Sequence, residues 1–131
     1  MKLINQELLH EVASQALKSE RLRMNYNFHD VLDAPAQRLL NALQPGTVVP
    51  VHRHPHTAET YIILSGKIRM LYYNDQKEVT DEAILDARTG NFGVHIPMNQ
   101  WHALEVLEKN TVIFEVKDGP YCPLDESNIL K

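Results

Sequence analysis

Three of the seven histidines stand at alternate positions: His52, His54 and His56. A single carboxylate, Glu59, follows them just before an apolar run. On a β-strand, residues i and i+2 point to the same face, so His52 and His54 are expected to project side by side. Two imidazoles on one strand make half of a metal site, and antiparallel pairing of the next strand can bring in the Glu59 carboxylate as an anionic ligand. The pattern therefore predicts a site for one divalent transition-metal ion.

A further ligand has to come from another part of the chain, and His102 is the candidate. It follows a strand end, a turn and the start of a new strand in the segment from Ile96 to His102, IPMNQWH. Three imidazoles and one carboxylate leave one or two coordination positions open in a five-coordinate or octahedral ion, as catalysis requires. These ligand types do not separate iron, manganese, nickel and zinc.

The spacing of the ligands resembles the first motif of the cupin superfamily, G-x5-H-x-H-x3-4-E-x6-G. Every fixed position is occupied, by Gly46, His52, His54, Glu59 and Gly66. The resemblance implies a barrel in which these histidines and the glutamate bind a metal ion.

The second cupin motif, G-x5-7-P-x-G-x2-H-x3-N, is matched through Gly90, Pro97 and His102. Two positions depart from it, because Asn99 stands in place of a glycine and Val106 in place of an asparagine. Asparagine is the non-glycine residue that most readily adopts positive φ, so Asn99 is expected to keep the turn. The asparagine that Val106 replaces is not a metal ligand in the motif.

Several longer segments together resemble the WbuC family of cupin-fold metalloproteins: QRLLNALQPG, HRHPH, the IP and WH pairs around His102, and FEVKDGPY. The resemblance covers the chain from about Arg21 to Pro123. It implies a metal-binding barrel of a kind often found among genes for O-antigen and other surface-polysaccharide biosynthesis, and it carries no settled reaction.

Four further residues are candidates for substrate binding: Arg38, His56, Tyr61 and His95. The Arg38 guanidinium can bind a carboxylate or phosphate in bidentate fashion. Tyr61 shares the strand parity of Glu59 and is expected to line the cavity, with core packing as the alternative. His56 is either a loop histidine in solvent or a neighbour of the metal, and His95 is either structural or part of the pocket. The sequence assigns no catalytic acid or base.

Hydrophobic periodicity predicts the elements that must position these residues. Apolar residues at helical spacing predict an amphipathic helix over residues 6–20 with Asn5 as its N-cap, and strict alternation predicts a strand over 21–30. Further strands are predicted over 37–43, 47–54, 59–64, 67–73, 83–85, 92–96, 101–107 and 111–117. Many short strands behind one helix indicate an antiparallel barrel or jelly roll. With the motif resemblance, the predicted fold class is an all-β cupin double-stranded β-helix with an N-terminal α-helix.

A chain of 131 residues has the size of one domain. Within it we expect an N-terminal helix-and-strand extension over 1–30, the cupin barrel over 31–117 and a C-terminal tail packed on the barrel over 118–131. A net charge of −4 without a basic stripe excludes nucleic acid as a partner, and the short apolar runs exclude a membrane. The absence of a secretory signal and the single Cys122 favour the cytoplasm. A homodimer is expected because small barrels leave strand edges for a partner to cover.

These observations predict a metal-binding cupin that acts on a carbohydrate or sugar-nucleotide in surface-polysaccharide biosynthesis, as an isomerase or epimerase. An Fe(II) dioxygenase is an alternative, because O₂ would take the same open coordination positions. A metal-dependent sugar-binding or sensor module without turnover is the alternative from a different class.

Overall fold

The computed structural model describes all of residues 1–131. It contains a helix α1 (Gln6–Lys18) and two short 3-10 helices, η1 (Ala87–Thr89) and η2 (Glu126–Asn128). The strands are β1 (Arg23–Asn27), β2 (Ala36–Leu43), β3 (Glu59–Ser65), β4 (Ile68–Tyr73), β5 (Val79–Leu85), β6 (Gly93–Ile96), β7 (Trp101–Val106) and β8 (Thr111–Asp118).

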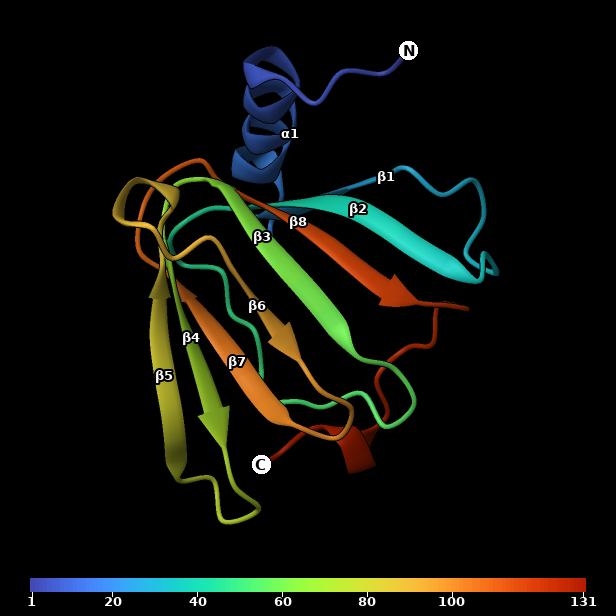
Figure 1. Cartoon of the computed structure of the whole chain (residues 1–131), viewed down its shortest axis with the longest axis vertical. Helices are drawn as coiled ribbons and strands as arrows, with labels where there is room; N and C mark the ends of the chain where they lie inside the picture. The colour runs from blue at the N-terminus through green and yellow to red at the C-terminus, as the bar shows by residue number, and fades with distance from the viewer.

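The strands form two antiparallel sheets that enclose a shared core (Figure 1). The larger sheet has the strand order β1-β2-β8-β3-β6, and the smaller has the order β5-β4-β7. The core contains Leu43, Ile63 and Ile113 from the larger sheet, and Ile68 and Met70 from the smaller. Because a fully buried side chain of this kind contributes roughly 1.5–3 kcal/mol, this shared core holds the two sheets together.

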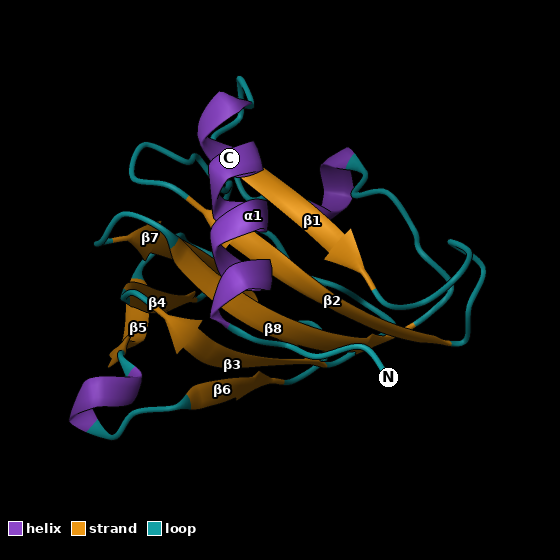
Figure 2. Cartoon of the chain, turned by 90° about the horizontal axis from the view of Figure 1, so that it is seen from above, coloured by secondary structure: helices purple, strands orange, loops and turns teal.

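Helix α1 lies on the outer face of the larger sheet (Figure 2). It begins after the predicted N-cap, Asn5, whose Oδ1 accepts a hydrogen bond from the Leu8 N–H at 3.0 Å. It ends at Lys18, two residues earlier than predicted, because Ser19 has an extended backbone. Its buried residues Leu8, Val12, Ala13 and Ala16 pack against Leu40, Ala42 and Val112 of the sheet. None of the helices combines the length and apolarity needed to cross a bilayer.

Alternate residues of β2 point to opposite faces of the larger sheet, and this determines where its polar residues lie. Leu40 packs beneath α1, and Arg38 shares this outer face by parity. Leu39 and Leu43 face the barrel interior, and Asn41 lies between them on the same face.

Six of the predicted strands match the structure to within one residue at each end. Two differ more. The strand β1 is shorter than the predicted 21–30, and β5 begins at Val79, four residues before the predicted start. The first residues of β5 are exposed and mostly polar, so hydrophobic alternation gave no signal for them.

The predicted strand over 47–54 is wrong. Within this segment only His52 forms β-bridges, with His102 of β7 and with Ile129 of the tail. Pro50 has no N–H to donate to a sheet, which explains why the segment does not join either ladder. It runs instead as a loop between the two sheets (Figure 1), in which Val48 and Pro50 are exposed and His52 is buried.

Both ends of the chain are attached to the barrel. The strand β1 pairs with β2 over its whole length, so the first 30 residues contribute a strand to the larger sheet. In the tail, the Leu130 N–H donates to the Val51 carbonyl at 2.8 Å, and the Asn128 carbonyl accepts from the Arg53 N–H at 3.1 Å. The tail therefore holds the histidine-bearing loop from the side opposite β7.

Gly66, the last glycine of the first motif, forms the tight turn from β3 to β4 at φ +81°, and a Cβ there would lie 2.7 Å from the Thr111 Cα. Gly90 has a similar φ of +92°, but nothing lies within 4 Å of its Cβ position. Gly66→Ala is expected to lower the free energy of unfolding by about 2–5 kcal/mol, from backbone strain plus the clash. Gly90→Ala should lower it by only about 1–2 kcal/mol, from strain alone. Urea denaturation measures both, and equal losses would contradict the role given to Thr111.

Candidate metal centre

Two backbone hydrogen bonds join the two histidine-bearing segments. The His52 N–H donates to the His102 carbonyl at 3.0 Å, and the His102 N–H donates to the His52 carbonyl at 2.9 Å. Two residues further along, the His54 carbonyl accepts from the Asn99 N–H at 2.9 Å. Asn99 has a φ of +66°, which confirms that asparagine keeps the turn where the motif has glycine. The turn before β7 thus fixes the loop that carries His52 and His54.

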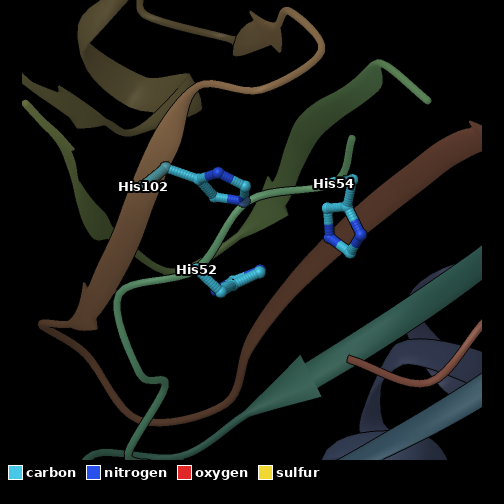
Figure 3. Close-up of side chains that lie close together, drawn as sticks. All are labelled: His52, His54 and His102. Carbon is cyan, nitrogen blue, oxygen red and sulfur yellow. The ribbon is translucent and has the colours of Figure 1, made fainter. Parts of the chain in front are cut away.

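The three imidazole rings point toward one another from the loop and from β7 (Figure 3). Ring centroids lie 4.3 Å apart for His52 and His102, 5.1 Å for His52 and His54, and 5.9 Å for His54 and His102. One nitrogen from each ring lies within 4.8 Å of the others. The structure therefore brings together the three histidines that the sequence selected, and such a cluster can bind a metal ion.

Hydrogen bonds on the far side of two rings fix their orientation. Nδ1 of His52 lies 2.8 Å from the Pro50 carbonyl, and Nδ1 of His102 lies 2.9 Å from the Gln100 carbonyl. Because a carbonyl only accepts, each Nδ1 carries the proton, and Nε2 keeps its lone pair. This is the arrangement found around metal-bound histidines.

Glu59 reaches the cluster from the first position of β3. Its Oε1 lies 3.0 Å from the His54 Nε2, and its Oε2 lies 3.5 Å from the His102 Nε2. Tyr61 donates its O–H to Oε2 at 2.8 Å. The expected pairing of the Glu59 strand with the histidine segment is wrong, since β3 pairs with β6 and β8. The carboxylate nevertheless comes beside two of the histidines.

One atom of the cluster has no partner of its own. The Nε2 of His102 is buried, and no hydrogen-bond partner satisfies it. An unsatisfied polar atom inside a protein costs about 1–3 kcal/mol, so its presence here requires an explanation. The lone pair on this atom, together with two neighbouring imidazoles and a carboxylate, fits a divalent ion. His52, His54, His102 and Glu59 are the residues that would hold it.

The protonation states suit this role. Burial, followed by the nearby His102, lowers the pKa of His52 to about 4, so this imidazole is neutral at pH 7. Burial alone would raise the pKa of Glu59, but the imidazoles of His102 and His54 outweigh it and hold the pKa well below its usual range. Burial, and then the charge of Glu115, raise the pKa of Tyr61, which remains a hydrogen-bond donor. The cluster therefore presents at least one neutral imidazole beside an anionic oxygen.

A cavity of about 250 Å³ adjoins the cluster and is lined by His52, His54 and Glu59. Its other wall is the inner face of the larger sheet, including Asn41 and Glu115. A second hollow of about 320 Å³ lies between the loop after His54 and the tail. The two hollows adjoin each other, because they share His54, Lys117 and the tail residues Tyr121, Cys122 and Leu124.

The four candidates for substrate binding are placed differently. Tyr61 is buried and lines the cavity, as the parity of β3 predicts. His56 is exposed in the second hollow, outside the three-histidine cluster. His95 lies on the outer surface, where its Nδ1 is 2.9 Å from the Thr60 Oγ1. Arg38 is exposed on the outer face of β2, so the structure does not bring it to the cavity.

Two of the polar cavity residues that were not selected from the sequence, Asn41 and Glu115, lie on the inner face of the larger sheet. Glu115 lies between the apolar residues Phe114 and Val116 on β8, and it is 6% exposed. Asn41 is likewise a single polar residue within an apolar stretch, and its Nδ2 donates to the Glu115 Oε1 at 2.8 Å. The sequence did contain a signal for both residues, since each is a polar side chain flanked by apolar residues on a strand. Such a side chain is expected to be buried, and a buried polar group requires a hydrogen-bond partner.

The family model described as a domain of unknown function (DUF6016) matches residues 4–85. This range includes the whole first motif and ends before the segment that contains His102. No curated protein sequence matches the chain.

Solved structures of cupin-fold proteins resemble the chain. The Cnp3 cupin domain of Schizosaccharomyces pombe has a TM-score of 0.59 at 11% identity, over 76% of this chain and 66% of the other. CapF of Staphylococcus aureus, described as a capsular polysaccharide assembling protein, has a TM-score of 0.62 at 18% identity, over 86% of this chain and 29% of CapF. A candidate sugar phosphate isomerase of Acidithiobacillus ferrooxidans has a TM-score of 0.59 at 20% identity, over 74% of this chain and 59% of the other. Together with the two antiparallel sheets and helix α1, these likenesses confirm the predicted cupin jelly-roll fold with an N-terminal helix.

Replacement of His52 or His102 by alanine is expected to remove most bound metal, because each change removes an imidazole from the cluster. His56→Ala is the matched control, since it removes an exposed histidine from the same loop and should leave the metal in place. Elemental analysis of protein purified without added metal measures the effect. Stoichiometric metal in His102→Ala, combined with its loss in His56→Ala, would reject the ligand assignment.

The metal-free protein is expected to lose stability as the pH falls from about 6.5 to about 4. The pKa of His52 is lowered in the fold, so the unfolded chain binds the proton first, and stability present above pH 6.5 is lost on the way to pH 4. A shift of this size corresponds to roughly 3 kcal/mol at most. Urea denaturation in EDTA at a series of pH values measures the slope. The slope of stability against pH should flatten in His52→Gln and persist in His56→Ala. An unchanged slope in His52→Gln would show that protonation of His52 does not cause the loss of stability.

Proposed function

The chain belongs to the family described as a domain of unknown function, DUF6016, and has the cupin fold; from the site in this barrel we propose that it is a metal-dependent isomerase or epimerase of a small carbohydrate. The observation that carries the proposal is the junction of the histidine cluster with a polar cavity. His52, His54 and Glu59 line that cavity directly, so a ligand inside it would lie against the proposed metal ligands.

A divalent ion held by these residues would supply Lewis-acid polarisation of a carbonyl or of neighbouring hydroxyl groups. Two surrounding side chains contact the Glu59 carboxylate. The Tyr61 O–H holds the Glu59 carboxylate in place, and the Lys117 Nζ lies 3.9 Å from the Glu59 Oε1 on the other side. Both Tyr61 and Lys117 line the cavity, so they also present a hydroxyl and a cation to a polar ligand.

The comparisons support a carbohydrate as the ligand. One structural neighbour is described as a candidate sugar phosphate isomerase, and CapF is described as a capsular polysaccharide assembling protein. The resemblance of this chain to the WbuC family points the same way, toward surface-polysaccharide biosynthesis in the cytoplasm. A homodimer, in which a second copy covers an edge of the larger sheet, belongs to the same proposal.

Deuterium exchange tests the proposed reaction. Metal-loaded protein is incubated in D₂O with hexose phosphates, hexuronates and the neutral hexoses, and the sugars are followed by proton NMR. Isomerisation or epimerisation by proton transfer replaces a C–H next to the carbonyl by deuterium or yields a new sugar. His102→Ala, which lacks one proposed ligand, serves as the inactive control.

The other outcomes separate the alternatives. Uptake of O₂ by the iron-loaded protein, with no exchange, would indicate a dioxygenase. A sugar that binds with stoichiometric metal present and is recovered without exchange would indicate a binding or sensor module. Either result would contradict the isomerase proposal.

A further inference from the structure

The inner face of the larger sheet carries a polar group that the proposed metal site does not use. Glu115 on β8 lies opposite Tyr61 of β3 and opposite Leu39 of β2 in the sheet register. Its carboxylate is buried, and its hydrogen bond comes from the Asn41 Nδ2 at 2.8 Å. A buried carboxyl retains further acceptor positions after a single hydrogen bond. It is therefore positioned to accept hydrogen bonds from a ligand in the cavity.

Asn41 provides a second acceptor at the same place. Because its Nδ2 is turned toward Glu115, its Oδ1 points elsewhere, and that oxygen is buried without a hydrogen-bond partner. Leaving it so costs about 1–3 kcal/mol. A ligand that donates hydrogen bonds, such as a compound with several hydroxyl groups, would satisfy this oxygen and Glu115 together.

Two arginines, the exposed Arg21 and the half-buried Arg23, lie at the β1 end of the same cavity. In the β1–β2 register, Asn25 lies opposite Asn41, and Arg23 lies opposite Leu43, two residues further along β2. The outward-pointing residues Met24 and Tyr26 pack against α1, so Arg23 and Asn25 face the inner side, and both line the cavity. Arg23 forms no ion pair with the protein. An unpaired, half-buried guanidinium is suited to a carboxylate or phosphate group.

The size of the cavity suits a small ligand. Its volume of about 250 Å³ lies below the range of about 300–1,000 Å³ that is typical for sites of drug-sized ligands. A single sugar unit fits within this cavity, whereas a sugar-nucleotide would have to extend beyond it, into the adjoining hollow of about 320 Å³.

We infer that Arg23, Asn41 and Glu115 form a subsite for an anionic monosaccharide, in which Arg23 binds the acidic group while Asn41 and Glu115 accept hydrogen bonds from hydroxyls. This inference rests on the proposed function, because it places the sugar in the cavity beside the histidine cluster. It replaces Arg38 with Arg23 as the residue that recognises the anion. The acidic group is a carboxylate or a phosphate, which a guanidinium binds in the same way.

Calorimetric titration of the metal-loaded protein tests the subsite, with three sets of probes in the gluco, manno and galacto configurations. These are the hexose 6-phosphates, the hexuronates and the neutral hexoses. Arg23→Gln should weaken binding of the anionic sugars about 10- to 100-fold and leave the neutral sugars unchanged. Asn41→Leu and Glu115→Gln should weaken both anionic and neutral sugars. Arg38→Gln is the matched control, because it removes an arginine from the outer face of β2. It should leave the affinity for every sugar unchanged.

Metal content and thermal unfolding of every variant are measured alongside, so that loss of the ion or of the fold is detected separately. Arg23→Gln is the decisive variant, because it removes a charge at the end of an edge strand without touching the core. Tighter binding of the phosphates or of the uronates identifies the acidic group, and either supports the subsite. Equal affinity of wild type and Arg23→Gln for the anionic sugars would overturn it, as would failure of every anionic sugar to bind. If no anionic sugar binds but a neutral hexose undergoes deuterium exchange, the subsite is rejected while the proposed reaction is retained.

Discussion

The reciprocal pair of backbone hydrogen bonds between His52 and His102 is the constraint on which the site depends. It joins an irregular loop to β7 and so brings together histidines that are 50 positions apart in the sequence. The loop cannot rely on a sheet for its position, because only His52 within it forms β-bridges. Its shape is set instead by three neighbours: β7, the turn at Asn99 and the C-terminal tail. A change in any of them would move His52 and His54 relative to His102.

This arrangement places polar groups where a barrel would otherwise bury apolar ones. One part of the interior is the apolar core between the two sheets, and another part holds imidazoles, two carboxyl groups and a lysine around a cavity. Two of the atoms there, the His102 Nε2 and the Asn41 Oδ1, are buried without partners. Proteins retain such atoms chiefly at functional sites, where a ligand satisfies them. We therefore interpret the two atoms as parts of one site, the first for a metal ion and the second for the hydroxyl groups of a sugar.

The sequence was sufficient for the fold class and for the histidine cluster, but not for the rest of the cavity. The spacing that this chain shares with the cupin motifs selected His52, His54 and His102, although two of the three lie on an irregular loop and not on a strand. It did not reveal that 47–54 is a loop, since its extended residues look like a strand until the missing hydrogen bonds are known. Arg38 was expected near the substrate, yet β2 is apolar on both faces, with Leu40 under the helix and Leu39 inside the barrel. The alternation of side chains along β2 therefore does not show which face of the strand lies inside the barrel. The same ambiguity concealed Asn41 and Glu115, whose pairing depends on the β2–β8 register.

The position of the metal can be located by anomalous X-ray diffraction from crystals of the metal-loaded protein, recorded at the absorption edge of the metal found by elemental analysis. We predict a single peak between the three rings, with the Nε2 atoms of His52, His54 and His102 at about 2.0–2.3 Å and a Glu59 oxygen at a similar distance. We also predict that at least one further coordination position faces the cavity lined by Asn41 and Glu115. A peak at the exposed His56 or at another surface site, with the three-histidine cluster empty, would show that these residues do not form the metal site.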